Sequence, residues 1–92
     1  MVHTASPVGT NPRNHDDMIR PAVNGVTFVL EAAAKNKVKR VVITSSVAAV
    51  GHPAPENDDY EYDENSWTDV ASNDYSAYIK SKTIAERAAW DF

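Results

Sequence analysis

The amino-acid sequence predicts an α/β fold in which a parallel sheet is covered by helices, in the order strand, helix, strand, long loop, helix. A segment with apolar residues at helical spacing lies between two short segments of strand character. In the second of these, residues 39–46, three β-branched residues follow one another, which is typical of a parallel strand covered on both faces. Residues 75–92 contain no Gly or Pro and are rich in Ala, which predicts a second helix.

The first two elements are a strand end and a helix. Residues 1–5 have the character of a buried strand that ends before a turn at Pro7 and Gly9. Acidic side chains at 16 and 17 suit the first turn of a helix, where they meet the positive end of the helix dipole. Pro21 is expected to kink this helix or to mark its true first turn. The apolar stripe expected to be buried consists of Ile19, Val23, Val26, Leu30 and Ala33.

The predicted C-terminal helix carries a tyrosine and a lysine four residues apart, Tyr78 and Lys82. This spacing places both side chains on one face, one turn apart. A tyrosine hydroxyl is ordinarily a weak acid, and a neighbouring ammonium group favours its ionised form and so makes it a better proton donor. Such a pair also arises by chance in many helices. Glu86 and Arg87 are expected to face away from the core.

Composition excludes several classes of function. With no cysteine there is no disulfide, thiolate metal site or cysteine nucleophile. The histidines are widely spaced, and the formal net charge of −4 argues against nucleic acid as a partner. No apolar run approaches the roughly 20 residues needed to cross a bilayer, and a cytoplasmic setting with no membrane partner is expected. The acidic run within residues 58–69 is interpreted as a solvated surface, and no metal site is predicted.

Five segments resemble one known family, and two of them are strand ends: Val-His-Thr-Ala-Ser-Pro at residues 2–7 and Thr-Ser-Ser-x-Ala-x-Val at residues 44–50. Tyr-Ile-Lys-Ser-Lys-Thr-Ile-Ala-Glu-Arg-Ala-Ala-Trp, residues 78–90, is similar to the active-site helix of extended short-chain dehydrogenases/reductases, the NAD-dependent epimerase/dehydratase superfamily. Residues 20–33 resemble a helix of the same family, in which Val26 replaces the usual Thr. Tyr-Asp-Glu-Asn-Ser-Trp-Thr-Asp, residues 62–69, resembles a segment of the branch with dihydroflavonol reductases, cinnamoyl-CoA reductases and yeast-type carbonyl reductases. Trp67 in this segment is interpreted as an anchor for the loop.

The resemblance implies a role for each matching residue. Tyr78 would donate the proton. Lys82 would make the Tyr78 hydroxyl a better proton donor and would hold the nicotinamide ribose. Ser46 would be the catalytic hydroxyl beside the substrate carbonyl. A hydroxyl after a strand also commonly caps a loop, so the role of Ser46 depends on its occurring together with Tyr78 and Lys82. Asn24 would support the site. The residues expected to contact the cofactor are Thr4, Ala5, Ser6, Thr44, Ser45, Tyr78 and Lys82.

Residues 1–92 are accordingly expected to form the middle portion of one NAD(P)-binding, Rossmann-like domain. The glycine-rich loop that holds the pyrophosphate is not found in the sequence, because its three glycines lack the required spacing. The C-terminal substrate region of the family is also expected to be missing. The expected sheet is therefore partial, with open edges and helices on one side only.

The implied reaction is the reduction of a ketone or aldehyde by hydride transfer, with NADPH as cofactor in preference to NADH. The isolated chain is expected to be weakly active or inactive. Two alternatives stay open: a nucleotide-sugar epimerase or dehydratase that keeps its cofactor bound, and a non-catalytic interaction module or inert truncated product. A small-molecule carbonyl substrate is the expected partner, and the two helices are candidate faces for a homodimer.

Overall fold

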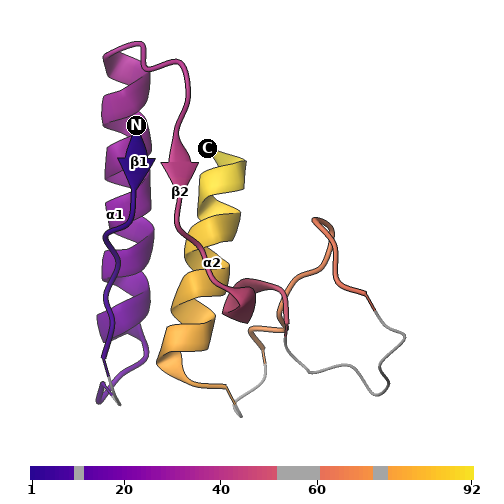
Figure 1. Cartoon of the computed structure of the whole chain (residues 1–92). Coiled ribbons are helices and arrows are strands. Elements are labelled where there is room, and N and C mark those ends of the chain that lie inside the picture. Colours follow the sequence, from indigo (N-terminus) through magenta and orange to yellow (C-terminus); the bar gives the residue numbers. More distant parts are fainter. Residues whose placement is uncertain (10–11, 52–60, 72–74) are drawn as a thin grey trace.

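The computed structural model describes residues 1–9, 12–51, 61–71 and 75–92. Their regular elements are β1 (Val2–His3), α1 (Asp16–Lys35), β2 (Val42–Ile43), the 3-10 turn η1 (Val47–Ala49) and α2 (Ala77–Asp91). Figure 1 shows that both helices run antiparallel to the two strands, and that the start of β1 and the end of α2 lie toward the same end of the molecule. The predicted order of elements is confirmed.

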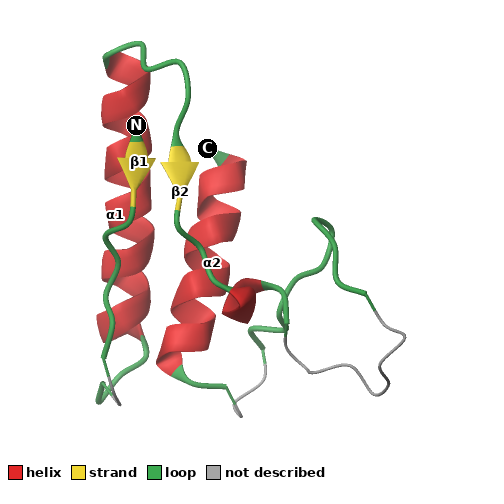
Figure 2. Ribbon diagram, in the orientation of Figure 1, coloured by secondary structure: helices red, strands yellow, loops and turns green. Residues whose placement is uncertain are grey.

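The two strands pair in parallel, with Val2 opposite Val42 and His3 opposite Ile43 (Figure 2). The backbone N–H of Val42 donates to the carbonyl of Met1, and that of Thr44 donates to the carbonyl of His3, each at 2.9 Å. β2 is shorter than the predicted strand over 39–46 because its partner β1 is itself two residues long.

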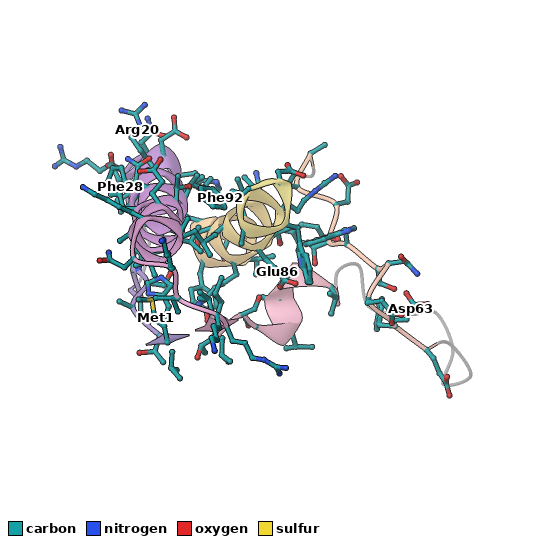
Figure 3. The ribbon with its side chains drawn as sticks, turned by 90° about the horizontal axis from the view of Figure 1, so that it is seen from above. Met1, Arg20, Phe28, Asp63, Glu86 and Phe92 are labelled. Atoms are coloured by element: carbon teal, nitrogen blue, oxygen red, sulfur yellow. The ribbon has the colours of Figure 1, made fainter. Side chains whose placement is uncertain are left out.

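Both helices lie on the same side of the strand pair, as Figure 3 shows from above. On the strands themselves Val2 is 69% exposed and Val42 is 59% exposed. The expectation that the β-branched run is covered on both faces is therefore wrong for the described residues, whereas the expected one-sided cover is confirmed.

Helix α1 begins and ends with local hydrogen bonds. The side-chain oxygen of Asn14 accepts from the N–H of Asp16 at 3.0 Å, and both predicted acidic residues lie in the first turn. Pro21 lies inside the helix and does not mark its start. At the other end Lys37 adopts the left-handed conformation with φ 56°, so that Val38 N–H reaches the carbonyl of Ala33 at 2.9 Å. This arrangement closes the helix in the manner usually provided by glycine.

The buried face of α1 is rotated from the predicted stripe. Val26 and Ala33 are buried as expected, but Met18 and Ala22 are buried in place of Ile19 and Val23, which are half-buried. The small side chains of Ala22 and Ala33 let α1 approach its neighbours closely. On α2 the buried residues are Ala77, Ser81, Lys82 and Thr83.

Candidate active site

Helix α2 places Tyr78 in its first turn and Lys82 one turn later. Ser76 caps the helix, because its side-chain oxygen accepts from the N–H of Ile79 at 3.3 Å. The Nζ atom of Lys82 lies 6.0 Å from the centre of the Tyr78 ring. The structure therefore brings this pair together on one face of α2, as the four-residue spacing predicts.

Lys82 is 7% exposed, and its ammonium group reaches the end of β2. A buried charge is costly unless it finds polar partners. Here Nζ donates to the carbonyl oxygen of Thr44 at 3.4 Å. Lys82 thus joins the candidate proton donor on α2 to the carboxyl end of β2, the edge where open α/β sheets bind their ligands.

Ser46 follows β2 and caps the turn η1. Its backbone is extended, and its side-chain oxygen accepts from the N–H of Ala48 at 3.1 Å. A hydroxyl has two lone pairs and one proton. Because this bond uses a lone pair, the Ser46 proton is available for donation to a carbonyl oxygen.

Glu86 belongs to the site although the sequence analysis expected it to face away from the core. It is half-buried, and one carboxylate oxygen accepts a short hydrogen bond from the Ser45 hydroxyl. Its other oxygen accepts from the indole N–H of Trp90 at 3.3 Å. The available signal was the spacing, since Glu86 lies four residues after Lys82 and therefore on the same face of α2.

Most of the predicted cofactor contacts surround one small cavity at the ends of the strands. Its lining includes Ala5, Ser6, Thr44, Ser45 and Lys82. Its volume is about 20 Å³, close to the space that one water molecule needs. Ligand pockets are typically about 300 to 1,000 Å³. The cavity that the described residues form is therefore too small to enclose a dinucleotide.

The other predicted residues lie outside this cavity. Thr4 is exposed and does not line it, and Tyr78 lines a separate hollow of about 330 Å³ beside Gly9 and His15. Ser46 also does not line the cavity. Asn24 is exposed on α1 and is absent from the cavity wall, and its supporting role stays a prediction.

Trp67, in the described segment 61–71 before α2, contacts that helix through Arg87. The guanidinium carbon of Arg87 lies 5.3 Å from the centre of the Trp67 ring, a cation–π contact. This contact supports the interpretation of Trp67 as an anchor, and it shows that Arg87 faces the loop.

Part of the acidic run, including Asp58 and Asp59, lies outside the described residues. Within the described residues no cluster of His, Asp or Glu could hold a metal ion.

A parallel strand pair with two helices on one side is the architecture of a segment of a Rossmann-like α/β domain. The chain belongs to the 3-beta hydroxysteroid dehydrogenase/isomerase family, whose model matches residues 1–90. The predicted fold class and the predicted superfamily are thereby confirmed.

Similar proteins lie in the predicted branch. Cinnamoyl-CoA reductase 1 of Arabidopsis thaliana is 46% identical over 91 residues, which are 97% of this chain and 26% of the relative. An anthocyanidin reductase of Vitis vinifera is 43% identical over 99 residues, covering 98% of this chain and 29% of that protein. The crystal structure of yeast methylglyoxal/isovaleraldehyde reductase complexed with NADPH matches with a TM-score of 0.79 and 40% identity, over 98% of this chain and 29% of that one.

The chain thus spans between a quarter and a third of the length of these relatives. Among the residues that the structure describes, no helix is both long enough and apolar enough to span a membrane.

Replacing Glu86 by Ala is expected to lower the free energy of unfolding by about 1 to 3 kcal/mol, because the Ser45 hydroxyl loses a charged acceptor in a half-buried place. Urea denaturation followed by circular dichroism measures this loss. Glu31→Ala is the matched control, since Glu31 is exposed on α1 and its removal is expected to change stability by less than about 0.5 kcal/mol. Equal effects of the two substitutions would show that the Ser45 contact contributes nothing.

Proposed function

We propose that this chain supplies the proton-donating centre of an NADPH-dependent reductase that converts a ketone or aldehyde to an alcohol. The observation that carries the proposal is the bond from Lys82 to the carbonyl of Thr44. It connects the helix of Tyr78 to Thr44, which lies two residues before Ser46. The chain thus connects three groups: Tyr78 and Ser46, which would act on the carbonyl oxygen, and Lys82, which would contact the cofactor.

Lys82, Ala5 and Ser6 are the residues that would hold a nicotinamide ribose at this edge of the strands. Lys82 offers an ammonium donor at the strand ends, and the small side chains of Ala5 and Ser6 line the same cavity, where larger ones would block close approach. When bound, the cofactor supplies a hydride to the carbonyl carbon. The solved yeast relative complexed with NADPH supports NADP(H) as the cofactor.

Each of the chain's own residues then has a defined task. The Ser46 hydroxyl donates a hydrogen bond to the carbonyl oxygen and stabilises the negative charge that develops there. Tyr78 gives its proton to that oxygen while the carbon receives the hydride, so that the C=O double bond becomes a C–O single bond with one new C–H and one new O–H bond. Lys82 stabilises the phenolate left on Tyr78 until a proton returns from solvent.

The reductase reading is favoured over an epimerase or dehydratase because the similar proteins named above are reductases. No contact in the described residues gives specific support to a non-catalytic module.

The experiment compares the 92-residue chain with a chimera in which it replaces the matching segment of Arabidopsis cinnamoyl-CoA reductase 1. Loss of NADPH absorbance is followed with a panel of ketones, aldehydes and thioesters. The chimera is expected to turn over, whereas the isolated chain is expected to show little or no turnover because its described cavity cannot enclose a dinucleotide.

The unmodified Arabidopsis enzyme is the control for the assay. A chimera that binds NADPH but reduces no carbonyl substrate would contradict the proposed reaction. Robust turnover by the isolated chain would contradict the proposal that it is weakly active.

A further inference from the structure

The segment 61–71 contains residues 62–69, which resemble a segment of the branch with the cinnamoyl-CoA reductases, yet the proposed reaction gives them no task. Its most deeply buried residue is Thr68, which is 2% exposed although Asp69 beside it is exposed. Thr68 makes two bonds to η1. Its N–H donates to the carbonyl of Ala49 at 2.8 Å, and its hydroxyl donates to the carbonyl of Ala48 at 2.6 Å. The segment is therefore bonded to the turn that Ser46 caps.

One peptide group carries this connection to Ser46. The carbonyl of Ala48 and the N–H of Ala49 belong to the same peptide unit. The carbonyl accepts from Thr68, while the N–H donates to the backbone carbonyl of Ser46 at 3.0 Å. In addition, the N–H of Ala48 donates to the Ser46 hydroxyl oxygen at 3.1 Å. Hydrogen bonds in such a series polarise and strengthen one another.

The helix of the candidate proton donor is bonded to the same carbonyl. Thr83, the residue after Lys82, is fully buried, and its hydroxyl lies 3.4 Å from the carbonyl oxygen of Ala48 and 2.8 Å from that of Ile79. Figure 1 shows η1 beside α2, with the segment 61–71 extending from that place. The Ala48 carbonyl thus joins the loop, the turn of Ser46 and the helix of Tyr78.

We propose that Thr68 is a positioning residue, which orients the Ser46 hydroxyl for carbonyl reduction through the peptide group between Ala48 and Ala49. This inference rests on the proposed function. If Thr68 only attached the segment 61–71 to η1, removal of its hydroxyl would lower overall stability but leave the geometry of η1 unchanged. If it positions Ser46, removal of the hydroxyl loosens the cap of η1 selectively.

The test is amide hydrogen exchange on the ¹⁵N-labelled 92-residue chain and its variants. Thr68→Val removes the hydroxyl and keeps the shape, and Thr68→Ser restores the donor. In Thr68→Val the protection of the Ala48 and Ala49 amides is expected to fall about 5- to 10-fold relative to the Val26 amide of α1, as for the loss of one buried hydrogen bond. In Thr68→Ser it is expected to stay within about twofold of the original.

Ser66→Ala is the matched control, because it removes a hydroxyl whose bonds among the described residues are to Asp63 in the same loop. It is expected to leave the Ala48 and Ala49 amides unchanged. Thr68→Ala repeats the test if Thr68→Val does not fold. An equal fall at Val26, or no fall at Ala48 and Ala49, would overturn the proposal.

The catalytic consequence is measured in the chimera. There Thr68→Val is expected to lower kcat by about tenfold with KM little changed, since a misdirected Ser46 donor acts on the transition state. An unchanged kcat would overturn the positioning role. The amide measurement needs neither cofactor nor turnover, so an inactive chimera counts against the proposed function while the exchange data still decide whether Thr68 controls η1.

Discussion

Replacing Tyr78 by phenylalanine in the chimera is expected to lower kcat for carbonyl reduction by about 10²- to 10⁴-fold, the usual contribution of a positioned general acid. The substitution removes only the hydroxyl, so the ring near Lys82 and the binding of NADPH should persist. Steady-state NADPH oxidation gives kcat, and quenching of protein fluorescence by the dinucleotide reports its binding.

Tyr62→Phe is the matched control for this experiment. Tyr62 is half-buried in the segment 61–71, and it belongs to no step of the proposed reaction. Its variant is expected to keep kcat within about threefold of the original, in line with a substitution outside the catalytic machinery. If Tyr78→Phe also kept kcat within this range, Tyr78 would not be the proton donor.

Val26→Ala is expected to lower the free energy of unfolding by about 2 to 3 kcal/mol, a large share of the roughly 5 to 15 kcal/mol that holds a small domain together. Val26 is 3% exposed and lines the cavity beneath Lys82 together with Ala22 and Ala85. Loss of its two methyl groups removes apolar contact and enlarges a void that already exists. Urea denaturation of the 92-residue chain measures the change.

Two further variants define the cause of that loss. Val47→Ala makes the same chemical change at a side chain that is 77% exposed, and it should cost less than about 0.5 kcal/mol. Val26→Thr introduces the residue that the resemblance of residues 20–33 to the family's helix leads us to expect there. It should cost less than Val26→Ala because it keeps the volume and its hydroxyl can bond a carbonyl one turn earlier in α1. Equal losses in Val26→Ala and Val47→Ala would contradict the packing argument.

The sequence predicted the helices well because their signals are local. Helical periodicity and the acidic first turn located α1, and the four-residue spacing of Tyr78 and Lys82 correctly placed them together on α2. The lengths and exposure of the strands depend on what lies beside them in space. For that reason the run at 41–43 did not reveal that β2 pairs over two residues and leaves Val42 exposed.

The parts of the site that were missed are those that depend on tertiary contacts. Glu86 was taken for a surface charge that faces away from the core, although helical spacing already placed it on the face of Lys82. Thr68 gave no signal of its own, since a hydroxyl in an acidic loop is ordinarily solvated. Thr68 can be buried because the Ala48 carbonyl of η1 accepts a hydrogen bond from its hydroxyl. The position of that carbonyl depends on the path of the backbone in three dimensions, which the sequence does not reveal.

The bond between Lys82 and the Thr44 carbonyl also determines how readily the site could accept a ligand. At 3.4 Å it is longer than the usual range for a strong N–H···O bond, so it holds the cation only loosely. The helix fixes where the side chain starts, while an ammonium group can rotate its three protons among several acceptors. An arriving sugar hydroxyl would therefore take over one of these protons at small energetic cost, without displacing the helix or breaking the strand pair.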